Sequence, residues 1–291
     1  MKPAEASATA KVIAASTLLL ASDARTAGLV AQGAAPLCQM LLSSKRSDRW
    51  LAASATFPLT RACLRWVERL TLPGIIAHYW HRKRWIERRC RDAIAAGYER
   101  VIVLGAGFDT LGLRLANELP HIEIIEIDHP ATQEAKRQAL AGRSFSSPGP
   151  IRFIARDLGA EPLTAALPND GKATIVIAEG VLMYLPPSRV AELFDALHGM
   201  KCARMLVLFS FMSTWPDGRL GFRPYSFLIE RWLAWRKEPF TWAIDPQGIR
   251  AYLAEHRFRL IELALTRQFS APSSISDASL EGENLVACER A

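Results

Sequence analysis

The feature that most constrains the fold is an alternation of short β-rich runs with helical stretches, which begins near residue 101. Seven runs rich in aliphatic and β-branched residues predict strands, at 101–104, 122–127, 151–154, 174–178, 204–211, 258–267 and 284–289. Helical periodicity between most of these runs predicts helices at 109–118, 130–141, 187–200 and 246–255. Because strands that alternate with helices usually run parallel, the pattern predicts an α/β fold with a Rossmann-like, doubly wound seven-stranded sheet.

The last strand is expected to be an exception. The segment between 267 and 284, QFSAPSSISDASLEGEN, is polar and shows no helical periodicity. The final strand therefore enters from a loop instead of a crossover helix, and we expect it to pair antiparallel near one edge of the sheet.

The rest of the chain predicts two additions to the sheet. Apolar residues at helical spacing before residue 98 predict an N-terminal helical cap over 1–97, followed by the sheet domain over 98–291. Residues 212–245 form an insertion that holds four of the eight tryptophans. Since inserted loops commonly carry specificity, we interpret 212–245 as a substrate lid.

Composition places few limits on function. The formal charge of +7 and the pI of about 9.4 would favour association with anionic partners but specify no activity. The five scattered cysteines form no C-x-x-C pair, so no disulfide framework and no metal site is expected, and a reducing, cytoplasmic location is the simpler interpretation. No apolar run reaches the ~18 residues of a membrane span.

The first strand ends in the turn VIVLGAGFDT, residues 101–110. Gly105 and Gly107 would allow a tight turn and close approach of a ligand to the backbone. A dinucleotide fingerprint would have a third glycine where Thr110 stands. Asp109 should cap the N–H groups of residues 111 and 112, and its charge would repel a pyrophosphate at that helix end while suiting a cationic ligand.

Acidic residues follow the next strands at their carboxyl ends. The second strand supplies Glu126 and Asp128, of which Asp128 lies nearer the end and is favoured for binding ribose hydroxyls. Asp157 after the third strand could bond an adenine amino group, and Glu179 follows the fourth. An acid-lined crevice beside a two-glycine turn matches S-adenosylmethionine, which has a ribose, an ammonium and a sulfonium but no phosphate.

Four segments, LGAGFDTLGLRL (104–115), EIDHP (126–130), RDL (156–158) and AEGVLMYLP (178–186), closely resemble the leucine carboxyl methyltransferase family. This resemblance implies a seven-stranded Rossmann-like fold and S-adenosylmethionine as methyl donor. It also implies that Arg82, upstream of the first strand, holds the methionyl carboxylate. The other cofactor contacts that it implies are Gly105, Ala106, Gly107, Asp128, Asp157, Leu158 and Glu179.

The sequence departs from the family pattern in two places. Leu111 stands where many bacterial relatives have arginine, and the lysine that some members contribute from their N-terminal helices has no clear match, Lys11 and Lys45 being the available candidates. The substrate site is therefore less well specified than the cofactor site.

The predicted function is methyl transfer to a small-molecule acceptor, and a carboxylate acceptor would need no base. Tyr184 is a candidate for positioning the acceptor, and Arg223 and Trp232 are candidates for binding a partly apolar or anionic substrate. His129 follows Asp128 directly but is interpreted as a turn residue beside Pro130.

Three other interpretations stay open. A methyltransferase acting on RNA or protein would use the basic helix near 82–91 as a phosphate-binding surface, although nucleic acid is not the favoured partner. A non-catalytic cofactor-binding homologue is the second alternative. A dinucleotide oxidoreductase is disfavoured by Asp109 and Thr110.

Overall fold

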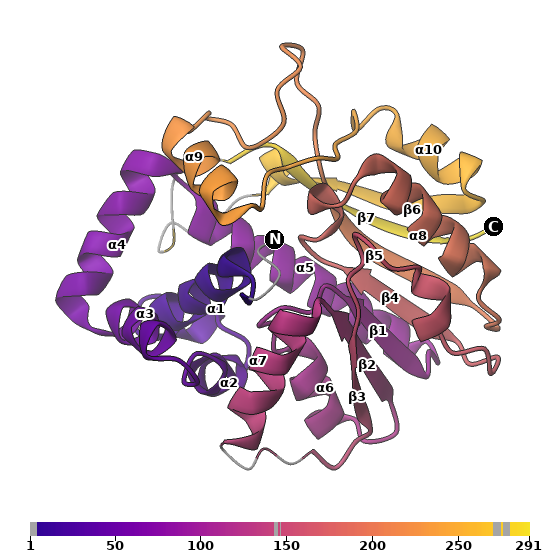
Figure 1. Ribbon diagram of the computed structural model, residues 1–291, viewed down its shortest axis with the longest axis horizontal. Helices are drawn as coiled ribbons and strands as arrows, with labels where there is room; N and C mark the ends of the chain where they lie inside the picture. The colour runs from indigo at the N-terminus through magenta and orange to yellow at the C-terminus, as the bar shows by residue number, and fades with distance from the viewer. Residues whose placement is uncertain (1–4, 143–144, 146, 270–274, 276–279) are drawn as a thin grey trace.

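The computed structural model describes residues 5–142, 145, 147–269, 275 and 280–291. Its centre is a seven-stranded sheet in the order β3-β2-β1-β4-β5-β7-β6 (Figure 1). The strands are β1 Arg100–Leu104, β2 Glu123–Asp128, β3 Ile151–Ala155, β4 Thr174–Ala178, β5 Met205–Met212, β6 Phe258–Leu265 and β7 Glu283–Arg290. Strands β1 to β5 pair in parallel, and β7 runs antiparallel to both β5 and β6. The predicted sheet with one reversed strand is therefore confirmed.

The four helices expected between the strands are present with small changes at their ends. They are α6 Leu111–Glu118, α7 Pro130–Ala141, α8 Pro187–Gly199 and α10 Ile249–Glu255. Helix α10 starts three residues later than expected because Asp245 forms a turn, in which its side chain accepts from the backbone N–H of Gln247 at 2.8 Å. Helix α6 also starts late, since Asp109 donates its backbone N–H to Ala106 in a turn.

Strand alternation divides the core between the two faces of the sheet. Ile102 and Leu104 of β1 point into one cluster with α8 and α10. Val101 and Val103 point into the other, which contains residues of α5 and α6. Both faces of the central strands are thus buried, as expected for parallel strands covered by helices.

In the described part of the chain before the sheet, the α-helices are α1 Ala8–Ala21, α2 Ala34–Leu41, α3 Arg46–Thr56, α4 Pro58–Thr71 and α5 Ile75–Ala95. Helix α5 packs under the sheet through Trp85 and Ile86. A third apolar cluster joins α1, α2 and α3 to α6 and α7 through Phe108 and Leu113. Figure 1 shows α1 to α4 gathered on one side of the sheet, with α4 at the outer edge.

The insertion 212–245 contains helix α9, Phe227–Arg236, between irregular segments. Of its four tryptophans, Trp242 is buried in the sheet cluster and Trp235 is 65% exposed. Short 3₁₀ turns occur at Ala27–Leu29, Leu163–Ala166, Leu182–Tyr184 and Thr266–Gln268. Within the described ranges, no helix combines the length and apolarity that crossing a bilayer demands.

Candidate functional site

A cavity of about 880 Å³ lies where the carboxyl ends of β1, β2 and β4 meet the N-terminal helices. Its lining includes residues of α1 and α5, the turn after β1 and the loops after β3 and β4. The order of the strands reverses at β1, which has β2 on one side and β4 on the other. This is the position at which open α/β sheets bind ligands, and the volume suits a nucleoside-sized molecule.

The turn after β1 favours glycine for two reasons, its backbone conformation and the short distance to neighbouring side chains. Gly105 and Gly107 have positive φ values of 63° and 52°. A Cβ on Gly105 would lie 2.5 Å from the side chain of Val181, and one on Gly107 would lie 3.0 Å from Ala10. Both positions therefore favour glycine, because the conformation is left-handed and a Cβ would lie close to a neighbouring side chain.

Asp128 is anchored beside this turn by two backbone donors. The N–H of Gly107 donates to Asp128 Oδ2 at 2.5 Å, and the N–H of His129 donates to Oδ1 at 2.6 Å. Burial nevertheless raises the pKa of Asp128 to about 6, since these hydrogen bonds offset only part of the cost of desolvation. Each oxygen accepts one bond in the turn, so further lone pairs are available on the cavity side.

The other acid of the second strand points elsewhere. Glu126 forms a buried ion pair with Lys136 of α7 at 2.6 Å. It packs over Gly112, where a Cβ would lie 2.6 Å from its carboxylate. Glu126 is not among the described residues that line the cavity, whereas Asp128 is.

Asp157 and Leu158 line the cavity from the loop after β3. Asp157 Oδ1 accepts from the backbone N–H of Gly159 at 2.9 Å, and its side chain is 42% exposed. Its other oxygen lies 3.8 Å from His129 Nε2. The carboxylate is thus held at the rim of the cavity, next to Asp128 along the sheet edge.

Arg82 lies buried at the base of the cavity between two carboxylates. Its Nε donates to Glu179 at 3.0 Å, and its Nη1 donates to both oxygens of Glu283 at 2.8 Å. His78 completes the cluster, with Nε2 2.6 Å from Glu283. Burial alone would raise the pKa of Glu283, but Arg82 and His78 outweigh it and lower that pKa to about 2.

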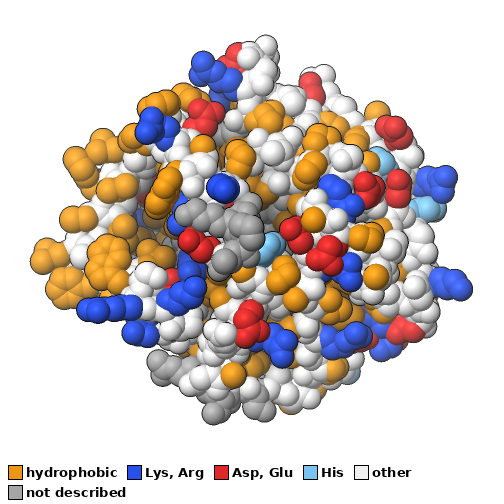
Figure 2. All heavy atoms as spheres, viewed as in Figure 1, with side chains coloured by type: hydrophobic (Ala, Val, Ile, Leu, Met, Phe, Trp, Pro, Cys, Tyr) orange, Lys and Arg blue, Asp and Glu red, His pale blue; other side chains and the backbone are white. Residues whose placement is uncertain are grey.

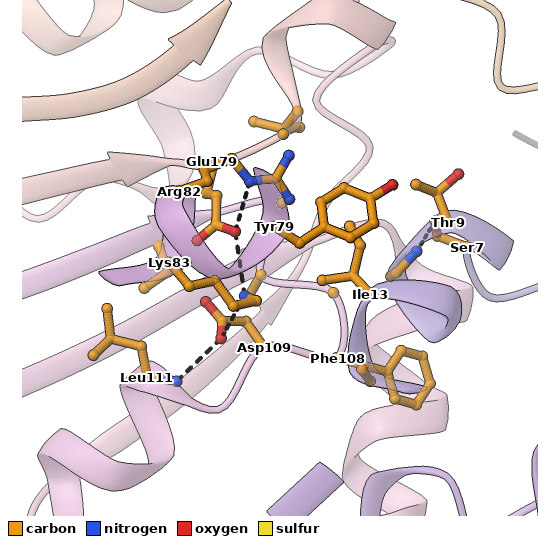
Figure 3. Close-up of a pocket in the computed structure, with 18 of the residues that line it drawn as sticks. Ser7, Thr9, Ile13, Tyr79, Arg82, Lys83, Phe108, Asp109, Leu111 and Glu179 are labelled. Carbon is orange, nitrogen blue, oxygen red and sulfur yellow. Dashed lines mark hydrogen bonds and ion pairs between the residues drawn. The ribbon is translucent and has the colours of Figure 1, made fainter. Parts of the chain in front are cut away.

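Lys83, which sequence reasoning missed, forms a second cationic centre in the same cavity. Its ammonium lies 3.0 Å from Asp109 Oδ1 and 3.2 Å from Glu179 Oε1 (Figure 3). Burial opposes ionisation of Asp109, yet the neighbouring Lys83 holds the pKa of this aspartate well below its ordinary range. The cavity therefore holds a lysine close to Arg82 in addition to its acids.

The capping role of Asp109 differs by one residue from the prediction. Its Oδ1 accepts from the N–H groups of Thr110 at 2.6 Å and Leu111 at 3.3 Å, whereas residues 111 and 112 were expected. The difference arises because α6 begins at Leu111, two residues after the aspartate.

Helix α1 and the end of the insertion together line the opposite wall. Ser7, which caps α1, and Thr9 and Ile13 of the helix lie across from Tyr79 in Figure 3. Glu238 accepts from the backbone N–H groups of Ala8 and Thr9 at 3.1 and 3.2 Å, so its carboxylate caps α1.

Tyr184 also lines the cavity, as its position after β4 suggested. Its ring lies 5.4 Å from that of Phe240, and burial raises the pKa of its phenol above the ordinary range. The hydroxyl is thus protonated at neutral pH and can donate a hydrogen bond.

Arg223 and Trp232 are absent from the described residues that line the cavity. Arg223 pairs with Asp217 at 2.8 Å and lies over the ring of Trp215 at 4.2 Å. Trp232 is half-buried in α9. Their assignment to a substrate site stays a prediction.

Neither candidate lysine of the N-terminal helices is among the described residues that line the cavity. Lys11 pairs with Asp48 at 2.9 Å, and Lys45 precedes α3 and is exposed. Five free cysteines are described, four of them buried, and the described residues contain no group of three or more metal-ligating side chains.

The reversed strand and the acid-lined cavity at the sheet's switch point are features of class I methyltransferase folds. A sequence model of the leucine carboxyl methyltransferase family matches residues 22–198, which is more than half of the chain. The chain therefore belongs to the leucine carboxyl methyltransferase family.

Individual relatives agree with this assignment. A protein of Saccharopolyspora erythraea named "Putative S-adenosyl-L-methionine-dependent methyltransferase" is 31% identical over 169 residues, which are 54% of this chain and 58% of that protein. A protein of the same name from Mycobacterium avium is 35% identical over 130 residues, 43% of this chain and 40% of that protein. The matched region thus spans about half the length of these curated relatives.

A crystal structure from Thermobifida fusca YX, described as a "putative methyltransferase", has the same fold. It superposes with a TM-score of 0.53 at 15% identity and covers 88% of this chain and 94% of its own.

Proposed function

We propose that this protein is an S-adenosylmethionine-dependent O-methyltransferase that acts on a small-molecule acceptor. The observation that carries the proposal is the position of Asp128, anchored by Gly107 and His129 in a cavity bordered by Asp157 and Glu179. Family membership and the names of the relatives support the same activity.

The residues present suit this cofactor. Asp128 keeps lone pairs for the two ribose hydroxyls, and Asp157 lies farther along the sheet edge, where it can accept from an adenine amino group. Gly105, Ala106 and Gly107 line the cavity, so the cofactor could lie close to their backbone. The helix end that would hold a pyrophosphate is instead occupied by the Asp109 carboxylate and Lys83.

Arg82 would hold the methionyl carboxylate through its free edge. Within the described part of the chain, its hydrogen bonds use Nε and Nη1, and Nη2 makes none. The acids that bind the first two donors fix the plane of the guanidinium, so that Nη2 is oriented before a ligand arrives. Lys83 would compensate the charge of Glu179 in the same region.

The bound cofactor would supply an electrophilic methyl group, and the task of the chain is to hold the acceptor in line with it. Tyr184 can donate a hydrogen bond to the acceptor from the wall of the cavity. The apolar side chains of α1 and Tyr79 exclude water around it.

A carboxylate is the acceptor group that we favour. His129 is the single histidine among the described lining residues, and its Nδ1 accepts from the N–H of Ala131 at 3.2 Å. In the neutral ring the proton must then lie on Nε2, so neither nitrogen is available as a base. A carboxylate acceptor needs no base, since it is ionised at neutral pH.

We assign 212–245 as a lid over the acceptor, because Lys237, Glu238, Pro239 and Thr241 line the cavity and Glu238 joins the insertion to α1. A cavity of about 880 Å³ suits a small molecule better than RNA. In the basic helix Arg89 and Arg91 pair with acids, which leaves Arg84 and Arg88 as its exposed arginines.

Calorimetric titration tests the cofactor assignment. Wild-type protein should bind S-adenosylhomocysteine but neither NADH nor NADPH, and Asp128→Ala should weaken binding at least tenfold. Unchanged affinity in the variant, or tighter binding of a dinucleotide, would overturn the assignment.

The acceptor group is tested with methyl-labelled S-adenosylmethionine and a panel of apolar carboxylic acids and the corresponding alcohols. Methyl esters release volatile methanol in mild base, whereas methyl ethers do not. Label that stays in base-stable products would contradict a carboxylate acceptor, and salt-sensitive methylation of RNA would favour the nucleic-acid alternative.

A further inference from the structure

Helix α4 is turned the opposite way from an ordinary surface helix. Leu59, Cys63, Trp66, Val67 and Leu70 follow the i, i+4, i+7, i+8, i+11 spacing of a single helix face. All five are exposed, including Leu59 at 73% and Trp66 at 64%, and no residue of the helix is buried. The apolar stripe therefore faces solvent.

The polar side of α4 faces the protein instead. Arg61 donates to the carbonyl oxygen of Ser22, and Arg65 donates to that of Ile275 at 3.3 Å. Glu68 accepts from the backbone N–H groups that begin α5. These contacts fix the rotation of the helix, so the exposure of its apolar face is specified by the fold.

Helix α3 extends the same apolar surface. Trp50 is 71% exposed, and Phe57, at the junction of α3 and α4, is 57% exposed. Hydrophobic side chains gather over α3 and α4 at the left of Figure 2, with Lys and Arg side chains beside them. We call this surface the α3–α4 patch, made up of Trp50, Phe57, Leu59, Trp66, Val67 and Leu70.

The charges around the patch are of one sign. Lys45, Arg46, Arg49 and Arg69 are exposed. In residues 45–71, all of which the structure describes, the only acids are Asp48, buried against Lys11, and Glu68, which points inward. Within residues 45–71, the exposed charged side chains are thus all cationic.

We propose that the α3–α4 patch docks on an anionic lipid surface. An apolar helix face that contains tryptophan and is flanked by arginine suits the interface of a bilayer, where the apolar side chains enter the acyl boundary and the guanidinium groups meet phosphates. A twofold contact between two copies would instead place the same cations against one another without acids to balance them. This docking is independent of the methyltransferase activity.

Vesicle flotation of this chain tests the proposal. Vesicles of phosphatidylcholine with phosphatidylglycerol should bind the wild type at least tenfold more strongly than phosphatidylcholine alone, and added salt should weaken binding. Trp66→Glu with Leu70→Glu should lower binding at least tenfold. Ile261→Glu is the matched control, since Ile261 is 47% exposed on β6, away from the patch, and should bind like the wild type.

A charge variant separates the two components. Arg46→Gln with Arg49→Gln and Arg69→Gln keeps the apolar stripe and should lower binding to anionic vesicles by roughly fivefold per charge. Equal binding to both vesicle types, no binding to either, or equal losses in the stripe variant and the Ile261→Glu control would overturn the proposal. So would a wild-type dimer in light scattering that the stripe variant converts to a monomer, because the occupant would then be a second copy.

Discussion

Ionisation of Asp128 should lower the stability of the ligand-free protein as pH rises, and Asp128→Asn should remove this pH dependence. Burial raises the pKa of Asp128 from 3.8 to about 6, although the N–H donors of Gly107 and His129 oppose the shift. Because the folded-state pKa lies above the unfolded value, the associated stability is complete below pH ~4 and is lost as pH rises through ~6.

The expected size follows from the two pKa values. A shift of about two units corresponds to a loss of ~3 kcal/mol at pH 8 relative to the protonated limit, of which ~1.4 kcal/mol falls between pH 5 and pH 8. Asparagine loses one of the two backbone hydrogen bonds, because its amide nitrogen would face an N–H donor. That loss costs ~1 kcal/mol at every pH.

Urea unfolding at pH 5 and pH 8 measures the effect. Between pH 5 and pH 8, the free energy of unfolding of Asp128→Asn should rise by ~1.4 kcal/mol relative to that of the wild type. Leu158→Ala, in the same cavity and without a titratable group, is the control and should differ from the wild type equally at both pH values. A stability difference between Asp128→Asn and the wild type that does not change with pH would refute the reasoning.

Three further predictions concern the residues around the cavity. Gly105→Ala should lower stability by ~1–3 kcal/mol in thermal unfolding, because Gly105 has a positive φ and the added Cβ would lie 2.5 Å from the side chain of Val181. Gly28→Ala is the control, since the space around its Cβ position is open, and it should change stability by less than ~0.5 kcal/mol. Lys83→Met should lower the free energy of unfolding in urea by ~2 kcal/mol at pH 7 and by less at pH 5. Without this cation the pKa of Asp109 rises, so Asp109 can take up a proton at pH 5. An equal cost at both pH values would contradict this. Glu238→Gln should cost ~1 kcal/mol and increase hydrogen exchange in the first turn of α1, and unchanged exchange would show that the cap has no effect.

The sheet could be predicted closely because its evidence is local. Each buried parallel strand is a short apolar run, and each crossover helix has its own periodicity, so neither depends on distant residues. The reversed strand β7 could be predicted because the segment before it has no helical pattern. Helix ends were less accurate where a side chain formed a turn, as at Asp245 before α10.

The candidate site could be predicted in part for a similar reason. Asp128 ends a strand and Asp157 and Glu179 follow one, and parallel strands bring their carboxyl ends to one edge. Glu283 could not be found in this way, because it lies 201 residues from Arg82 and approaches it only through the reversed strand. Lys83 carried no distinguishing signal among the basic residues of α5.

The sequence by itself determined the class of fold, the glycine turn and the family, because these depend on residue type at fixed spacing along the chain. Tertiary structure alone decided how the charges are distributed. It placed Arg82 between Glu179 and Glu283, and it added Lys83 to the cavity. It also turned the apolar face of α4 toward solvent, because periodicity specifies that a helix has two faces and only its contacts decide which of them is buried.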